Sequence, residues 1–250
     1  MPTAVVTGAT AGIGLAFVQR LANDGYDVVL VARDKKRLDQ TAGSLTGVST
    51  EVLPADLATD DGIAAVEERV SRDDVTMLVN NAGFGHRGKF LHVPVTDELA
   101  MLKVHAEAVL RLTSAALPGM VDRGRGDIVN VASVAAFFVR GTYGASKAWV
   151  VSFSQAVRQD VGTSGVRVLA LCPGFTHTEF HDRAGMDMTG VPSFLWMSAE
   201  DVVDGCLRDL RAGKAVSVPG WQYKAMVGAG NLLPRSLAGR LSSRAGRRYK

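Results

Sequence analysis

Short runs of β-branched and other apolar residues alternate along the chain with longer stretches in which apolar positions recur at helical spacing. The runs are apolar throughout, which is typical of parallel strands that are buried on both faces. They predict about seven strands, at Thr3–Thr7, Tyr26–Val31, Thr50–Leu53, Thr76–Asn80, Asp127–Val131, Val166–Leu171 and Ala215–Val218. The alternation predicts an α/β fold with a doubly wound parallel sheet flanked by helices.

One helix carries a clear start signal. Thr96 is a good N-cap, and Asp97 and Glu98 place negative charge in the first turn, where the helix dipole favours it. Apolar residues follow at helical spacing from Leu99 to Leu117. We therefore expect a helix that begins after Thr96.

No linker divides the 250 residues, so we expect a single domain over 1–250. The least regular stretch is 175–197, which combines large apolar side chains with Gly185, Gly190 and Pro192. A long apolar loop in a compact domain is often a lid or a binding loop. We expect this segment to cover the substrate.

Composition excludes several classes of protein. Cys172 and Cys206 are too few for a disulfide framework or a tetrahedral zinc site, so we expect no metal. The sequence begins with a strand-like run instead of a signal peptide, and no stretch of ~20 apolar residues predicts a membrane span. We expect a cytoplasmic protein.

The net charge is +3, but positive charge gathers in the C-terminal segment 221–250. No acidic residue follows Asp209, and 235–250 contains five arginines and one lysine around Leu237 and Leu241. A basic amphipathic helix can bind an anionic membrane weakly, whereas a surface helix that packs its leucines on the core would show the same pattern. The basic residues form one short terminal segment, which argues against nucleic-acid binding.

The first predicted strand leads into a glycine-rich turn that precedes a helix. Such a turn lets the backbone approach a pyrophosphate at the positive end of the helix, as in Rossmann-type folds, although a tight strand–helix connection needs glycine too. The residues that we expect at the cofactor are Gly8, Thr10, Ala11, Gly12, Ile13 and Gly14.

The second predicted strand leads into Ala32 and Arg33. A site for NAD commonly has a carboxylate here, which holds the ribose 2′-hydroxyl. Ala32 cannot do this, but the guanidinium of Arg33 suits a 2′-phosphate. The sequence therefore favours NADP(H) over NAD(H), unless Arg33 simply belongs to the solvated helix start that Asp34 begins.

Tyr143 and Lys147 lie four residues apart, so they share one face of a helix. A nearby ammonium favours the phenolate, and we expect it to bring the pKa of Tyr143 closer to neutrality. Ser133 follows the preceding strand, where its hydroxyl is placed to bind a substrate oxygen. A Tyr-x-x-x-Lys spacing by itself is also common on helix surfaces.

Together these motifs resemble the short-chain dehydrogenase/reductase family over nearly the whole chain. The matching segments are the turn at 7–14, Asp56-Leu57, Asn80-Asn81-Ala82-Gly83, Ser133, Tyr143 with Lys147, and Pro173-Gly174 followed by Thr176. The resemblance implies a homodimer or homotetramer that moves a hydride between a nicotinamide and a carbonyl or alcohol substrate.

The resemblance also implies roles for single residues. Tyr143 would exchange the proton, Ser133 would bind the substrate oxygen, and Lys147 would bind the nicotinamide ribose. The adenosine half of the cofactor would lie against Asp56, Leu57, Asn81, Ala82 and Gly83, and the nicotinamide against Pro173, Gly174 and Thr176.

Two features depart from the family pattern. His105 stands where many members have an asparagine whose backbone holds a relay water, so His105 either keeps that role, adds a titrating group or is merely packed. Ser133 precedes Tyr143 by only ten residues, a shorter connection than is usual, and Phe137 and Phe138 within it would line an apolar pocket.

Two other functions are compatible with the sequence. One is a catalytically silent NADP(H)-binding sensor, against which the presence of Ser133, Tyr143 and Lys147 argues. The other is a membrane-surface interaction protein that acts through the basic C-terminal segment.

Overall fold

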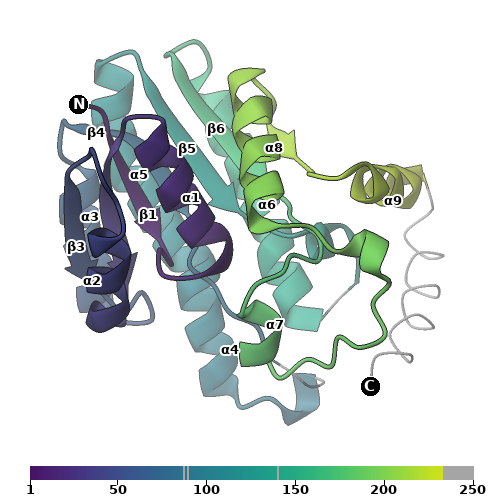
Figure 1. Ribbon diagram of the computed structural model, residues 1–250. Helices are drawn as coiled ribbons and strands as arrows, with labels where there is room; N and C mark the ends of the chain where they lie inside the picture. The colour runs from purple at the N-terminus through teal and green to yellow at the C-terminus, as the bar shows by residue number, and fades with distance from the viewer. Residues whose placement is uncertain (87, 89, 140, 233–250) are drawn as a thin grey trace.

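Seven parallel strands form one sheet, in the order β3-β2-β1-β4-β5-β6-β7 (Figure 1). The computed structural model describes residues 1–86, 88, 90–139 and 141–232. The strands are β1 (Thr3–Thr7), β2 (Asp27–Ala32), β3 (Thr50–Pro54), β4 (Val75–Asn80), β5 (Gly126–Val131), β6 (Val166–Leu171) and β7 (Val216–Ser217). The predicted doubly wound parallel sheet is confirmed.

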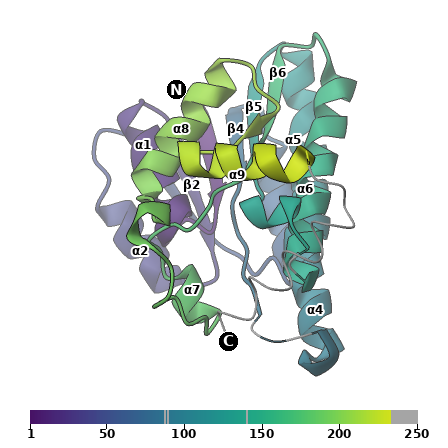
Figure 2. The same ribbon diagram turned by 90° about the vertical axis from the view of Figure 1, so that its right-hand side faces the viewer.

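Helices cover both faces of the sheet (Figures 1 and 2). Apolar side chains of α1, α2 and α8 pack on one face, and those of α3, α5 and α6 pack on the other. The α-helices are α1 (Gly12–Asn23), α2 (Lys35–Gly43), α3 (Asp60–Val70), α4 (Val95–Leu102), α5 (Ala108–Asp122), α6 (Gly141–Val161), α7 (Phe180–Arg183), α8 (Ala199–Arg211) and α9 (Trp221–Leu232).

Strand β1 shows why the strands are apolar without interruption. Ala4 and Val6 point into the cluster formed with α1 and α8, whereas Val5 points into the cluster formed with α3 and α5. All three are fully buried. A strand that is covered on both faces has no polar position to alternate with.

The strand order reverses between β1 and β4, which are paired neighbours. Connections from β1 and β4 leave the sheet at the carboxyl edge in opposite directions, so a crevice opens between them. Ligands of open α/β sheets bind at such a switch point. The turn after Thr7 and the segment after Asn80 are therefore placed at the expected ligand-binding edge.

The helix after β4 differs from its prediction. It begins at Val95 with Pro94 as N-cap, because the amides of Asp97 and Glu98 both donate to the Pro94 carbonyl. Thr96 therefore lies inside the first turn and is not the cap. The helix is also interrupted by a π-helical turn at Lys103–Glu107, which separates α4 from α5.

A polar network crosses the core between β4, β5 and the helices beside them. Asn80 Nδ2 donates to Asn130 Oδ1 at 2.8 Å and to Thr113 Oγ1 at 3.2 Å, and Asn130 Nδ2 donates to Ser154 Oγ at 3.0 Å. The four side chains are at least 96% buried. Each amide is satisfied only while its partners keep their positions, so the network ties α5 and α6 to the sheet.

The predicted C-terminal segment 221–250 is described only as far as α9. Leu237, Leu241 and the arginines from Arg235 to Arg248 lie outside the described residues. Among the helices of the described part, none is both long and apolar enough to cross a bilayer.

We expect Asn130→Ala to lower the free energy of unfolding by about 1–3 kcal/mol, because it removes the acceptor of a buried Asn80 amide. Urea denaturation measures the change, and Asn23→Ala, at an exposed position of α1, is the matched control. A loss as small as that of the control would show that the network contributes little to stability.

Candidate functional site

The glycine-rich turn leaves the start of α1 open. Gly8 and Gly12 adopt φ values of +68° and +53°, and a Cβ on Gly14 would lie 2.1 Å from the Gly8 carbonyl oxygen. Ala11 is the N-cap of α1 and has no side chain that can accept from the helix amides. The first amides of α1 are therefore free to bind an anion, as a cofactor pyrophosphate requires. Thr10 and Ile13 lie half-buried on the same turn.

Thr7 and Asn81 hold this turn against the end of β4. The Thr7 hydroxyl accepts from the amides of Asn81 at 2.9 Å and Ala82 at 3.0 Å, while Asn81 Nδ2 donates to the carbonyls of Thr7 and Gly8. The Asn81 side chain thus holds the backbone of the glycine-rich turn in place. Thr7 is not among the site residues that the sequence predicted, although a threonine that ends a strand at a switch point can indicate such a supporting role.

Arg33 and Asp34 follow β2. Arg33 is exposed, and Asp34 caps α2 by accepting from the amide of Arg37 at 3.1 Å. Asp34 therefore begins the helix, as its position suggested. Across from them, Asp56 accepts from the amide of Ala58 and is half-buried, whereas Leu57 packs into the core and exposes only 6% of its surface.

The structure brings Ser133, Tyr143 and Lys147 together at the carboxyl ends of β5 and β6. Ser133 is the N-cap of a 3-10 turn that follows β5, and Tyr143 and Lys147 lie on the first turns of α6. Lys147 is 96% buried, and its Nζ donates to the Val131 carbonyl at 2.8 Å. The same Nζ lies 6.0 Å from the centre of the Tyr143 ring.

Burial governs the titration of these groups. It raises the pKa of Tyr143 to about 12, against an opposing hydrogen bond with Ser133, and it lowers the pKa of Lys147 to about 8. The expected shift of the Tyr143 pKa toward neutrality is not found in the protein without ligand, because desolvation outweighs the hydrogen bond with Ser133. Tyr143 is consequently a neutral phenol at pH 7, which is the form that donates a proton.

His105 is fully buried in the π-helical turn and is bonded on both sides. Its Nε2 accepts from the amide of Phe84 at 3.2 Å, so the proton of the neutral ring is on Nδ1, which lies 2.9 Å from Ser146 Oγ. Ser146 in turn donates to the Tyr143 carbonyl at 2.8 Å. A Cβ on Gly83 would lie 2.9 Å from Nε2, so Gly83 makes room for the ring.

The segment after β6 crosses the carboxyl edge of the sheet and carries α7, which lies below the sheet in both ribbon views (Figures 1 and 2). Pro173 accepts from the amide of Val134, and Thr176 is buried with its hydroxyl on the Gly174 carbonyl. The Pro173 carbonyl therefore lies beside the residue that follows Ser133.

Tyr223 of α9 anchors the segment 175–197 at both ends. Its hydroxyl accepts from the amide of Phe175 at 2.8 Å and donates to the Leu195 carbonyl. Its ring leaves no room for a side chain at Gly174, where a Cβ would lie 2.0 Å away. Helix α9 is thus part of the site's support, a role that its position in the basic C-terminal segment did not suggest.

Apolar side chains surround the open side of Tyr143. The Phe180 ring lies 5.8 Å from the Tyr143 ring, and a Cβ on Gly85 would contact Phe180, Tyr143 and Met186 at 3.4–3.8 Å. Phe137 is partly buried and packs against the core around β6 and α6. The apolar surroundings come from 175–197 and from the segment after β4.

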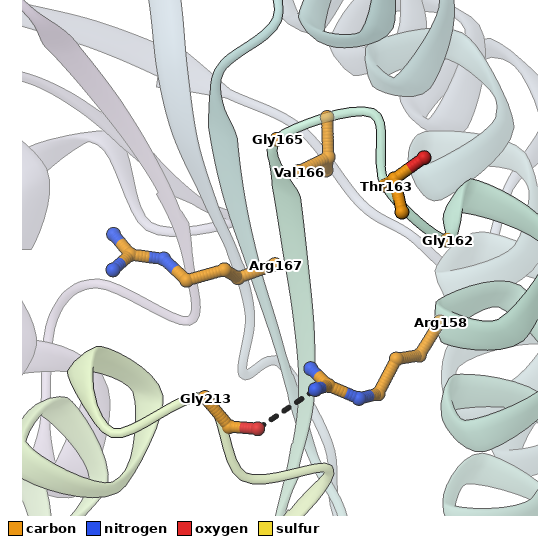
Figure 3. A pocket seen from close by; sticks show the side chains of 7 residues that line it. All are labelled: Arg158, Gly162, Thr163, Gly165, Val166, Arg167 and Gly213. Atoms are coloured by element: carbon orange, nitrogen blue, oxygen red, sulfur yellow. Dashed lines mark hydrogen bonds between the residues drawn. The ribbon is translucent and has the colours of Figure 1, made fainter.

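A hollow also lies at the opposite edge of the sheet, beside the start of β6 (Figure 3). Its two arginines already have partners: Arg158 donates to the Gly213 carbonyl at 2.7 Å, and Arg167 pairs with Asp127 at 2.6 Å. The hollow gathers no acid, base or nucleophile, so the chemistry belongs to the carboxyl edge.

Comparison with known proteins agrees with this geometry. A family model described as short chain dehydrogenase matches residues 2–188. A very-long-chain 3-oxoacyl-CoA reductase from Anas platyrhynchos is 34% identical over 202 residues, which cover 76% of this chain. The match spans only 63% of the length of that relative.

Two solved structures are similar over nearly the whole chain. A short-chain dehydrogenase from Sphingobium yanoikuyae in complex with NADPH has 37% identity and a TM-score of 0.85, with 92% of this chain and 93% of that one covered. A bulky-bulky ketone specific alcohol dehydrogenase from Comamonas testosteroni has 30% identity and a TM-score of 0.80, with 94% and 96% covered.

We expect His105 to stay neutral in the folded protein at mildly acidic pH. Burial and the Lys147 ammonium lower its pKa well below the usual value. Below pH ~6.5 the unfolded chain then binds more protons than the folded protein. The free energy of unfolding of the wild type therefore falls as the pH is lowered, by up to about 1.4 kcal/mol per pH unit. His105→Asn should lose this part of the slope in urea denaturations between pH 7.5 and 5.

Exposed His92, changed to asparagine, is the control for that comparison. An unchanged slope in His105→Asn would contradict the neutral assignment. If the imidazole serves only as a bonded neutral group, His105→Asn should also keep the pH profile of turnover, and a shifted profile would assign proton transfer to the ring.

Proposed function

Because this chain belongs to the short-chain dehydrogenase family, we propose that it is an NADP(H)-dependent oxidoreductase that interconverts a carbonyl and an alcohol on an apolar substrate. The observation that carries the proposal is that Ser133, Tyr143 and buried Lys147 lie together at the same sheet edge as the open start of α1.

The residues at the switch point suit a dinucleotide. The free amides of α1 suit its pyrophosphate, and the exposed Arg33 suits a 2′-phosphate at the end of β2. When bound, the nicotinamide supplies or accepts the hydride. The complex of the Sphingobium relative with NADPH supports the choice of cofactor.

Tyr143 performs the proton transfer in this proposal. With its pKa raised to about 12, the phenol keeps its proton at pH 7 and donates it to a substrate oxygen that gains charge as the carbonyl is reduced. Ser133 donates a hydrogen bond to the same oxygen. Lys147, held by the Val131 carbonyl, places a positive charge near Tyr143, and this charge stabilises the phenolate that remains after the proton has moved.

The substrate is apolar in this proposal, because Phe180 and Met186 surround the open side of Tyr143. The names of two relatives, a very-long-chain 3-oxoacyl-CoA reductase and a bulky-ketone alcohol dehydrogenase, support a large apolar carbonyl compound. We also propose a cytoplasmic homodimer or homotetramer. Leu99, Leu102 and Leu110 expose 43–59% of their surface along α4 and α5, which supports an oligomer.

We expect Tyr143→Phe to lower kcat/KM by ~10²–10⁴ in a screen of ketones with NADPH, because the general acid is lost. NADPH affinity, measured by fluorescence titration, should stay within about threefold. Tyr26→Phe removes a phenol hydroxyl far from the site and is the control. Near-normal turnover by Tyr143→Phe would exclude the mechanism.

We expect Arg33→Ala to weaken NADPH binding much more than NADH binding, since a charge-assisted hydrogen bond contributes ~1.5–3 kcal/mol. Equilibrium titration with both cofactors measures the two affinities, and Lys36→Ala, also exposed at the start of α2, is the control. Equal weakening for both cofactors, or a wild-type preference for NADH, would contradict the assignment of NADP(H).

A further inference from the structure

Arg37, on the first turn of α2, connects two segments that border the cofactor crevice. Its guanidinium forms a two-pronged ion pair with Glu179, with Nη2 at 2.8 Å and Nη1 at 3.1 Å from the two carboxylate oxygens. Nη2 also donates to the Thr10 carbonyl at 3.1 Å. One side chain therefore joins α2, the glycine-rich turn and the start of the segment 175–197.

The neighbouring Thr178 brings the same segment directly onto the turn. A Cβ on Gly12 would lie 2.7 Å from the Thr178 methyl carbon, so the Thr178 side chain packs directly on the turn. Glu179 also pairs with Arg183 one helical turn later. Glu179 consequently has a second cation that holds it when Arg37 changes partner.

Arg37 also lies where a 2′-phosphate is expected. The amides of Gly8 and Ala9 donate to the Val31 carbonyl, which puts the glycine-rich turn against the end of β2. The adenosine ribose of a bound dinucleotide lies at the end of that strand. Arg37 lies on the first turn of α2, four residues after Arg33, and its Nη2 is bonded to the Thr10 carbonyl of the glycine-rich turn.

We propose that Arg37, in addition to Arg33, selects the 2′-phosphate. When the phosphate binds, Arg37 leaves Glu179 and pairs with the phosphate. This inference rests on the proposed use of NADP(H). A phosphate monoester carries about −1.5 to −2 charges at pH 7, and arginine binds it with the same fork geometry as a carboxylate. The phosphate thus competes with a carboxylate of lower charge.

The exchange links cofactor choice to the substrate loop. Glu179 and Arg37 are 142 residues apart in sequence, and their pair ties the start of 175–197 to α2. A ligand with a 2′-phosphate releases this tie, whereas a ligand without it leaves the tie in place. The loop therefore responds to NADP(H) and not to NAD(H).

The test uses two adenosine fragments, adenosine 2′,5′-bisphosphate and 5′-AMP, which differ only in the 2′-phosphate. Isothermal titration calorimetry on the full chain gives both affinities without turnover. We expect Arg37→Met to weaken the bisphosphate at least tenfold and Glu179→Gln to tighten it about threefold or more, with 5′-AMP nearly unchanged in both. Arg37→Met with Glu179→Gln should bind the bisphosphate as weakly as Arg37→Met alone.

Lys35→Met is the matched control, because Lys35 lies on the same helical turn and pairs with Asp39. Equal losses of bisphosphate affinity in Arg37→Met and Lys35→Met would show that any nearby positive charge has this effect, and would overturn the inference. Weakened bisphosphate binding by Glu179→Gln would also overturn it. Wild-type protein that binds the two fragments equally would instead contradict the proposed use of NADP(H).

Hydrogen exchange gives a second readout on the wild-type protein. The bisphosphate should speed exchange at the amides of 178–183, and 5′-AMP should not. Exchange at these amides that is the same with both fragments would show that the ion pair does not couple the phosphate to the loop.

Discussion

The hydrogen bonds between Thr7 and Asn81 hold together the two strand ends on which the site depends. Each of the two residues forms hydrogen bonds through both its backbone and its side chain, so the turn after β1 and the segment after β4 form one unit. This unit places the open start of α1 on one side. On the other side it leads to Phe84, whose amide is bound by His105. The cofactor crevice and the catalytic edge thus share one structural support.

Burial is the second constraint, and it moves the groups around Tyr143 toward their neutral forms. It raises the pKa of Tyr143 and of Cys172, both to about 12, and it lowers the pKa of Lys147 and His105. The free protein therefore keeps the phenol protonated and the imidazole uncharged.

The segment 175–197 is held in two different ways. Tyr223 binds both of its ends through partly buried hydrogen bonds between uncharged groups. Glu179 instead holds it through exposed charges that an incoming anion can displace. The first contact preserves the position of the loop, and the second makes its start responsive to what binds beside α2.

The sequence by itself determined the strand pattern, the glycine-rich turn, the shared face of Tyr143 and Lys147, and the capping role of Asp34, because each depends on residues close together along the chain. It predicted the helix start two residues late, because the Pro94 carbonyl caps the helix at Val95. It also did not determine the π-helical turn around His105 or the high pKa of Tyr143. Those depend on packing between α4, α6 and the sheet. Contacts such as Arg37 with Glu179, or Tyr223 with Phe175, join residues that are far apart in sequence, and only the tertiary structure decides which distant side chains meet.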